Sequence, residues 1–322
     1  MKVGYFLSSE EWGPKDLVAQ AVQAQEAGFE DLWISDHYHP WNDRQGHSPF
    51  VWSTIGAIAA AAPGMGLTTA VTCPMMRIHP AVIAQAAATS AVLLDGRFRL
   101  GVGTGEALNE HIFGDAWPNA DVRLEMLEEA VELIRALWQG GVRDHRGRHY
   151  RVEHARLYDL PGSPPEIVVS GFGQKSVELA ARIGDGYCTV GPDEESVKLF
   201  RSTGGAEKVV QGGLKVCWGE DESQAREHVY RLWPNEGLPG ELAQILPTPE
   251  HFEQASELVT EEMLGDVPCG PDVDTHVAAI EAYAEAGFDE LYVNQIGPDQ
   301  DAFFAAYRQD VLPRLRDTAA QT

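Results

Sequence analysis

Residues 66–110 have the sequence GLTTAVTCPMMRIHPAVIAQAAATSAVLLDGRFRLGVGTGEALNE. The apolar runs at 66–71 and 98–103 have the length of buried strands, and the segment between them, 81–94, is long enough for a helix. Two strands joined through a helix pair in parallel, because such a crossover returns the chain to the same end of the sheet. This stretch therefore predicts one β-α-β unit of a parallel sheet.

The same alternation continues on both sides of this unit. We expect eight strands, at 3–7, 31–34, 66–71, 98–103, 166–170, 186–189, 214–218 and 290–294. The clearest helices are expected at 14–27, 51–62, 81–94, 123–139 and 174–183. Eight strands with intervening helices predict an α/β fold, a (β/α)8 TIM barrel, and a doubly wound parallel sheet is the alternative.

Two stretches interrupt the alternation. Residues 140–160 have the pattern of a hairpin around Gly147, and residues 234–270 are irregular and rich in Pro, Gly and Glu. Barrels often reach this chain length as one unit. We therefore expect a single barrel domain over residues 1–322, with insertions near 140–160 and 234–270.

The composition excludes several classes of function. The 24 Lys and Arg against 49 Asp and Glu give a net charge of −25, whereas binding to nucleic acid or to an anionic membrane needs a basic surface. No stretch offers the ~18 uncharged apolar residues of a membrane span. The 4 cysteines show no CxxC spacing, and no signal-peptide pattern precedes the first strand. We expect a cytoplasmic protein that binds neither nucleic acid nor membranes.

In a barrel, functional residues lie on the loops that follow the strands. Three such loops, 35–41, 103–110 and 170–174, are rich in polar, aromatic or glycine residues. The glycine run from Gly101 does not fit the dinucleotide-binding fingerprint, because Glu106 stands where that fingerprint needs Gly or Ala and we expect no helix to begin there. A tight turn would explain the glycines alone, whereas Glu106 and Asn109 favour a ligand loop.

His37, Trp41 and Glu106 follow two different strands and are expected at one mouth of the barrel. A histidine and a carboxylic acid can act as a base and an acid, and Trp41 can wall a pocket or stack on a planar ligand. The alternative for His37 is a capping or core histidine that Asp36 holds. The concurrence of the three residues favours a catalytic site.

A metal site is a further alternative, because His37 and His39 follow a strand in the H-x-H pattern of metal-dependent hydrolases. Such sites need additional ligands on later strands. Here those strands end in Glu106, Ser170 and Thr189. We therefore expect no metal ion.

Gly171, Phe172 and Gly173 precede a helix that is expected to begin at Gln174. Free N–H groups at a helix N-terminus attract anions, and the helix dipole adds to the attraction. A plain glycine turn between strand and helix explains the pattern equally well.

These loops resemble those of a known family. The segment Ser35-Asp36-His37 with Trp41, and the segment LGVGTGEALNE at 100–110, closely resemble the F-420-dependent glucose-6-phosphate dehydrogenases of the luciferase-like (β/α)8 oxidoreductases. The segments HPAVIAQ at 79–85, GDGY at 184–187 and YAEAGFD at 283–289 resemble the same group. The resemblance implies an F-420-dependent dehydrogenase that is a homodimer.

The resemblance also implies a role for individual residues. His37 would take the proton of a substrate hydroxyl while a hydride leaves its carbon for C5 of the cofactor, an 8-hydroxy-5-deazaflavin. Glu106 would protonate ring nitrogen N1, and Trp41 would shape the pocket. The implied cofactor contacts are Asp36, Val71, Cys73, Thr104 and Asn109 for the ring and Gly171, Phe172, Gly173 and Gln174 for the tail. Glu10 and Thr189 would bind the substrate, and a cis peptide is implied at Ala70-Val71.

Two positions depart from the sugar-phosphate enzymes. Pro192 and Gln254 stand where we align lysines that hold the substrate phosphate. A phosphate dianion without such donors is costly to bury. The substrate therefore stays open between a sugar phosphate, an unphosphorylated sugar and a secondary alcohol.

Three other functions compete with an F-420-dependent dehydrogenase. The first is an FMN-dependent luciferase-like monooxygenase, and the others are a metal-dependent hydrolase and a barrel without enzymatic activity.

Coenzyme F-420 is an anion, so a protein of net charge −25 should repel it at long range. We therefore expect added salt to strengthen cofactor binding.

Overall fold

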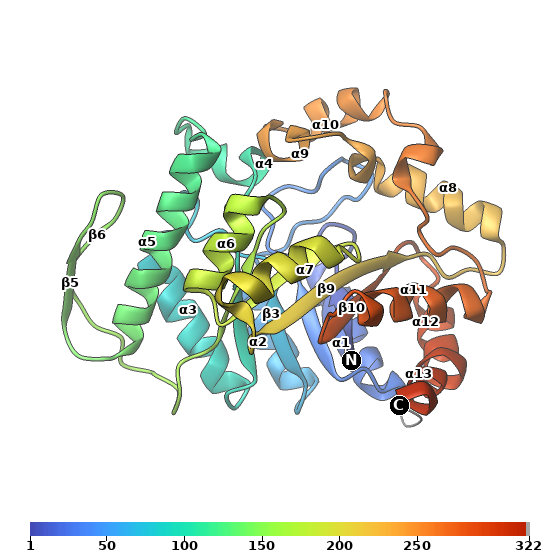
Figure 1. Cartoon of the computed structure of the whole chain (residues 1–322), viewed down its shortest axis with the longest axis horizontal. Helices are drawn as coiled ribbons and strands as arrows, with labels where there is room; N and C mark the ends of the chain where they lie inside the picture. Colours follow the sequence, from blue (N-terminus) through green and yellow to red (C-terminus); the bar gives the residue numbers. More distant parts are fainter. Residues whose placement is uncertain (320–322) are drawn as a thin grey trace.

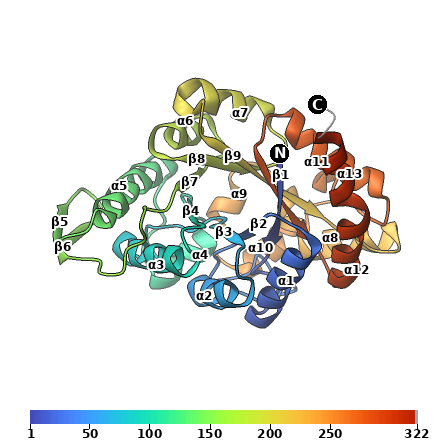
Figure 2. The same ribbon diagram turned by 90° about the horizontal axis from the view of Figure 1, so that it is seen from below.

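The computed structural model describes residues 1–319, which form a closed barrel of parallel strands surrounded by helices (Figures 1 and 2). The strands are β1 (Lys2–Leu7), β2 (Asp31–Ile34), β3 (Gly66–Thr69), β4 (Phe98–Val102), β7 (Ile167–Ser170), β8 (Gly186–Val190), β9 (Val209–Val216) and β10 (Glu290–Gln295). Their order around the barrel is β1-β10-β9-β8-β7-β4-β3-β2. The predicted (β/α)8 fold is thus confirmed, and closure excludes the open, doubly wound sheet.

Helices cover the outside of the barrel. They are α1 (Pro14–Ala27), α2 (Val51–Ala61), α3 (Pro80–Leu93), α5 (Ala120–Trp138), α6 (Gln174–Ile183), α7 (Glu194–Phe200), α11 (Val273–Glu285), α12 (Gln300–Ala306) and α13 (Leu312–Ala319). The first of these shows how the sequence sets its limits. Pro14 begins α1, and Gly28 ends it with a φ of 93°, a left-handed conformation that glycine adopts without strain. In the described residues no helix combines the length and apolar character that crossing a membrane requires.

Three predicted elements have a boundary that differs from the structure by two residues or more, and one short helix was not expected. The strand predicted at 66–71 ends at Thr69, and the Ala70-Val71 peptide that follows is cis, as the resemblance implied. The strand predicted at 214–218 is instead β9, which begins at Val209. The helix predicted from Arg123 begins at Ala120. Glu106 does precede a helix, the single turn α4 (Ala107–Glu110), so the expectation of none was wrong.

The floor of the barrel, which we define as the N-terminal end of its strands, is held by a network around Glu290. This carboxylate accepts from Arg99 Nη1 at 2.5 Å, Gln211 Nε2 at 2.7 Å and Tyr292 Oη at 2.8 Å. Burial opposes ionisation of Glu290, but the hydrogen bond and charge of Arg99 keep its pKa below the usual value. Trp33 stacks on Tyr292 above this network and fills the interior.

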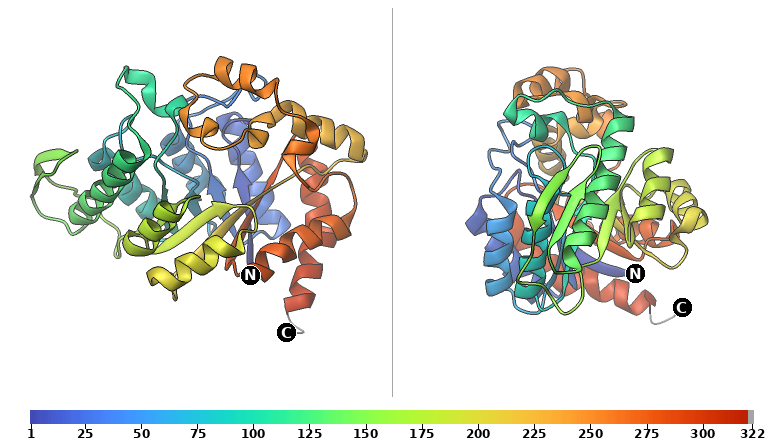
Figure 3. Two further views of the ribbon diagram at one scale, coloured as in Figure 1. Left: turned by 45° about the horizontal axis from the view of Figure 1, so that its top comes forward. Right: turned by 90° about the vertical axis from the view of Figure 1, so that its left-hand side faces the viewer.

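The opposite end, which we call the mouth, is partly covered by residues 234–270, which we call the cap segment. It contains the short helices α9 (Leu242–Ile245) and α10 (Pro249–Ser256) and follows α8 (Glu222–Leu232). Figures 1 and 3 show these helices across the barrel from the N-terminus. The stretch 140–160 contains the antiparallel pair β5 (Arg143–Arg146) and β6 (Arg151–Ala155), which projects beside α5.

Candidate active site

Loops after β2, β3 and β4 bring the sequence-predicted residues together at the mouth. The first carries Asp36, His37 and Trp41, and the third carries Glu106, which is the N-cap residue of α4. Gly105, which directly precedes Glu106 in the third loop, has a φ of 68°. A Cβ at this position would lie 2.6 Å from Cys73 Sγ. The loop after β4 therefore needs glycine at this position to pack against the loop after β3.

His37 faces hydrogen-bond acceptors with both ring nitrogens. Its Nε2 lies 3.3 Å from Glu10 Oε1, and its Nδ1 lies 3.1 Å from the His39 carbonyl oxygen. Glu10 is oriented by the hydroxyls of Ser8 and Ser35, which each donate to Oε2 at 2.8 Å. The side chain of His37 is 10% exposed, so a small molecule at the mouth can reach it. A carboxylate thus lies beside Nε2 and a carbonyl beside Nδ1, and both can accept a hydrogen bond from the ring.

Asn109 connects the histidine with the acid. Its Oδ1 accepts from the backbone N–H groups of Tyr38 at 2.8 Å and His39 at 3.2 Å. The amide nitrogen must therefore face the other way, where it lies 3.2 Å from both His37 Nδ1 and Glu106 Oε2. Asn109 is 2% exposed, so its visible function is to fix the spacing of His37 and Glu106.

Trp41 forms a wall beside His37. The centres of the two rings are 5.0 Å apart at 61°, and the indole also packs against Phe252 of α10, with ring centres 5.1 Å apart. The cap segment thus contributes an aromatic residue that the irregular sequence of 234–270 did not reveal. An aromatic wall of this kind binds apolar or planar groups.

Asp36 lies beneath the surface rather than facing the mouth. Its Oδ1 accepts from Arg77 Nη2 at 2.8 Å, and its Oδ2 accepts from Thr72 Oγ1 at 2.7 Å. Arg77 also binds Glu110, through its backbone N–H at 2.7 Å and its Nε at 3.3 Å. Burial raises the pKa of Glu110, whereas the charge and hydrogen bonds of Arg77 oppose this. Arg77 thereby joins the loops after β2, β3 and β4, a role that sequence analysis missed.

Val71, Cys73 and Thr104, the other predicted ring contacts, lie on the loops after β3 and β4. Val71 packs against the position of Gly103, where a Cβ would lie 2.7 Å from Val71 Cγ2. Burial, followed by the charge of Glu110, raises the pKa of the Cys73 thiol, so this group stays neutral. Val71 and Thr104 are partly exposed and uncharged, and Cys73 is buried behind them.

Gly171 and Gly173, in the segment 171–174 that was predicted to bind an anion, differ in whether the structure requires glycine. A Cβ on Gly171 would lie 2.7 Å from Ser176 Oγ, so packing alone requires glycine there. At Gly173 the φ is −110° and a Cβ would meet nothing within 4 Å, so neither conformation nor packing demands glycine. The Gly173 N–H already donates to Ser176 Oγ at 3.1 Å, so the N–H groups without an intrahelical acceptor are those of Gln174 and Lys175.

Thr189, a predicted substrate contact, lies apart from these residues. It occupies the same face of β8 as Tyr187, whose ring stacks on Phe200 of α7 outside the barrel at 5.1 Å. A hydrogen bond from Thr189 lowers the pKa of Tyr187, although burial has the larger, opposite effect. The structure does not bring Thr189 together with His37 and Glu106.

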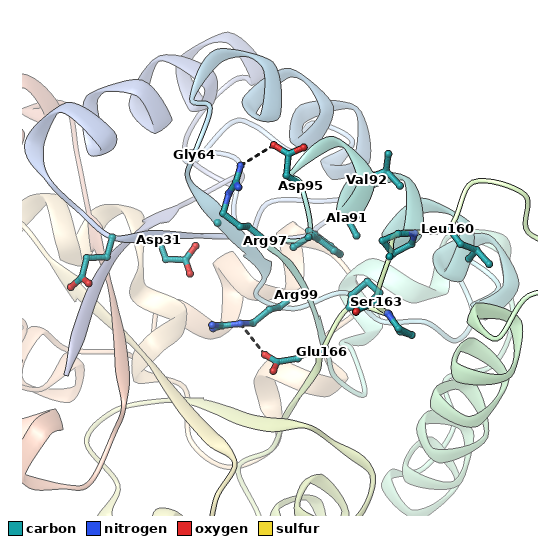
Figure 4. Close-up of a pocket in the computed structure, with 18 of the residues that line it drawn as sticks. Asp31, Gly64, Ala91, Val92, Asp95, Arg97, Arg99, Leu160, Ser163 and Glu166 are labelled. Atoms are coloured by element: carbon teal, nitrogen blue, oxygen red, sulfur yellow. Dashed lines mark hydrogen bonds and ion pairs between the residues drawn. The ribbon is translucent and has the colours of Figure 1, made fainter.

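A cavity of about 980 Å³ lies at the floor (Figure 4). Arg97, Arg99 and Asp31 line it, and its ion pairs are Arg97–Asp95 at 3.3 Å and Arg99–Glu166 at 3.2 Å. None of the predicted site residues lines this cavity. In barrels the floor serves stability.

Within residues 1–319, His, Cys, Asp and Glu nowhere form a group of three suited to a metal ion. His39, the second histidine of the H-x-H pattern, has its Nδ1 2.9 Å from the Leu108 carbonyl oxygen. The residues at the mouth thus lack the ligand set of a metal-dependent hydrolase.

Comparisons with known proteins identify the family of the chain. The family model described as "Luciferase-like monooxygenase" matches residues 1–290. An F-420-dependent glucose-6-phosphate dehydrogenase from Amycolatopsis mediterranei is 36% identical, over 98% of this chain and 99% of that protein. An F-420-dependent hydroxymycolic acid dehydrogenase from Mycobacterium tuberculosis is 37% identical, over 98% of this chain and 88% of that protein. The structure of an F-420-dependent secondary alcohol dehydrogenase, in complex with an F-420–acetone adduct, has a TM-score of 0.89 at 28% identity, over 96% of this chain and 97% of that one.

Proposed function

Because the chain belongs to the luciferase-like monooxygenase family, we propose that it is an oxidoreductase that transfers hydride. The hydride leaves the hydroxyl-bearing carbon of a sugar, sugar phosphate or secondary alcohol, and coenzyme F-420 accepts it. The relatives whose names specify F-420 support this cofactor. The observation that carries the proposal is the alignment of Glu10, His37, Asn109 and Glu106 through contacts of 3.2–3.3 Å.

His37 acts on the substrate hydroxyl in this proposal. A hydroxyl placed at the mouth gives its proton to Nε2 as the carbon loses hydride. The charged ring then donates Nε2–H to Glu10 and Nδ1–H to the His39 carbonyl, which are both already within 3.3 Å. Trp41 holds the carbon skeleton against the histidine. Glu10 therefore acts through His37, instead of binding the substrate alone.

The residues around the mouth fit a deazaflavin. Val71 and Thr104 would offer an uncharged surface for a ring, with the neutral, buried Cys73 behind them, and the N–H groups of Gln174 and Lys175, in the first turn of α6, would face an anionic tail. When bound, the deazaflavin supplies a carbon, C5, that accepts hydride. Glu106 would hold the proton destined for ring nitrogen N1, with Asn109 keeping its carboxyl in position. Asp36 would support the ring from below through Arg77 and Thr72.

The experiment is a spectroscopic one. Purified protein is titrated with F-420 and with FMN, and the visible absorbance of oxidised F-420 is followed after alcohols, sugars and sugar phosphates are added. Preferential binding of F-420 and bleaching by at least one substrate support the proposal. Preferential binding of FMN would favour the luciferase-like monooxygenase instead.

We also propose that the whole chain acts as one barrel domain, as a homodimer in the cytoplasm. The four described cysteines are all free, which suits a reducing compartment. Apolar side chains on α3, among them Val82 and Leu93, are more than half exposed and would suit burial by a second subunit. Light scattering of the purified protein tests the dimer.

A further inference from the structure

The inner surface of the barrel carries one cation at the mouth. The eight barrel strands contain three Lys or Arg residues, Lys2, Arg99 and Lys215. The first two lie at the floor, where both pair with Glu290. On β9, Gln211 bonds Trp33 inside the barrel, and a Cβ at Gly213 would also meet this indole. Because side chains alternate along a strand, Lys215 leaves β9 on the same inner face, next to the mouth.

Glu236 of the cap segment already neutralises this lysine. Its Oε1 lies 3.0 Å from Lys215 Nζ, and the ammonium lies 4.4 Å from the centre of the Trp233 ring. The Lys215 side chain is 16% exposed, so water screens the pair only in part. Trp233 belongs to the apolar cluster against which Trp41 packs. The pair therefore adjoins the aromatic wall beside His37.

The remainder of the cap segment adds negative charge and no positive charge. Residues 234–270 contain 8 Asp and Glu and neither Lys nor Arg. Pro192 and Gln254, at the positions where a lysine would hold a phosphate, are exposed and uncharged. An anion at the mouth would therefore meet these carboxylates, while Lys215, the cation that the barrel strands direct there, is already paired. Arg123, which contacts the cap segment through Gln244 Oε1 at 2.8 Å, is only 3% exposed.

We propose that Glu236 makes the site selective for uncharged hydroxyl compounds, namely secondary alcohols with apolar substituents, and against phosphorylated substrates. This inference rests on the proposed function and narrows it. Trp41 and Phe252 provide the apolar contact, and the Lys215–Glu236 pair excludes anions because its cation is already satisfied. Removing the carboxylate while keeping the lysine converts the pair into an anion-binding group.

The first test uses inorganic phosphate and no cofactor. Its affinity is measured by isothermal titration calorimetry for the wild type, for Glu236→Gln and for the double variant Glu236→Gln/Lys215→Met. We expect Glu236→Gln to bind phosphate at least about tenfold more tightly than the wild type, and the double variant to lose this gain. Glu257→Gln, which removes an exposed carboxylate from the same segment, is the matched control and should give less than a third of the gain. Equal affinity in the wild type and Glu236→Gln would overturn the inference.

The second test compares kcat/KM for cyclohexanol and for glucose 6-phosphate in F-420 reduction. The wild type should prefer the neutral alcohol at least ~100-fold, and Glu236→Gln should shift this ratio about tenfold toward the phosphate. A wild type that prefers glucose 6-phosphate overturns the inference and keeps the proposed function. A protein that binds no F-420 overturns the proposed function, while the phosphate titration still decides the role of Glu236.

Discussion

At the floor of the barrel, Glu290 accepts hydrogen bonds from three buried or partly buried donors, whereas at the mouth Glu106 accepts one, from Asn109. The pKa of Glu290 is lowered, chiefly because Arg99 overcomes the effect of burial. At the mouth, burial instead raises the pKa of Glu11 from 4.5 to about 7. Glu290 at the floor thus keeps its charge through Arg99, whereas within residues 1–319 no such cation is bound to Glu11 at the mouth, which can exchange a proton near neutral pH.

The largest effect should follow from removing the base at the mouth. His37→Ala should lower kcat/KM by about 10²–10⁴-fold, because no other group between the substrate and Glu10 accepts the proton. His39→Ala, which removes a ring bonded to the Leu108 carbonyl, is the control and should cost far less. Normal turnover by His37→Ala would contradict the mechanism.

Replacing the acid should give the next effect. Glu106→Gln keeps the hydrogen bond from Asn109 but holds no transferable proton, so kcat should fall at least ~100-fold while F-420 affinity is retained. Stopped-flow absorbance of F-420 reduction measures the rate, and fluorescence titration measures binding. A variant that turns over normally would show that the proton comes from elsewhere.

A substitution at the floor should lower the free energy of unfolding and leave the catalytic rate nearly unchanged. Arg99→Met leaves the buried carboxylate of Glu290 without its closest cation, at a cost of about 3 kcal/mol of unfolding free energy. Urea denaturation measures this loss, and kcat of the folded variant should stay within about threefold of the wild type. Arg97→Met, which loses only an exposed partner, Asp95, should cost under about 1 kcal/mol. A catalytic defect in Arg99→Met without a loss of stability would contradict the division of labour between the two ends.

Glu11 should make the mouth sensitive to pH. Its carboxyl accepts from Trp233 of the chain leading into the cap segment and from Gly297, and burial gives it a pKa of about 7. A carboxyl whose pKa is higher in the folded state binds its proton there first, so stability falls as pH rises from about 4.5 to 7. The loss for the wild type is of order 3 kcal/mol. In Glu11→Gln the melting temperature should fall less between pH 5 and 7.5, and an unchanged slope would contradict this assignment.

The smallest effect concerns the net charge of −25. Raising the salt concentration from 20 to about 200 mM should strengthen F-420 binding two- to threefold, because it screens the repulsion between two anions. Fluorescence titration measures the affinity. Weaker binding in salt would mean that local donors such as the N–H groups near Gly173 dominate the interaction.

The barrel could be predicted from sequence because the β-α alternation is a local pattern. The start of β9 could not, since residues 209–213 read VVQGG and resemble a loop. The fold explains why these residues are small: Gly212 lies against Tyr283, and Gly213 lies against Trp33. The prediction of which loops form the site needed only the strand ends.

The partners of the site residues were harder to predict. Glu10 was expected to contact substrate, but its pairing with His37 depends on how β1 and β2 meet. Arg77 and Phe252 were missed, because a single arginine or phenylalanine on an irregular stretch carries no pattern. Their contacts join segments that are 33 to 211 residues apart in the sequence, and local sequence patterns do not predict contacts over such separations.

The contacts of Arg77 limit how this barrel can be re-engineered. Loops of a (β/α)8 barrel are commonly exchangeable units, because each is anchored by its own strand and helix. Here one guanidinium anchors the loops after β2, β3 and β4 by binding Asp36 and Glu110. Replacing one of these loops with a loop from another barrel would leave a buried charge without its partner. The three loops could instead be transferred together.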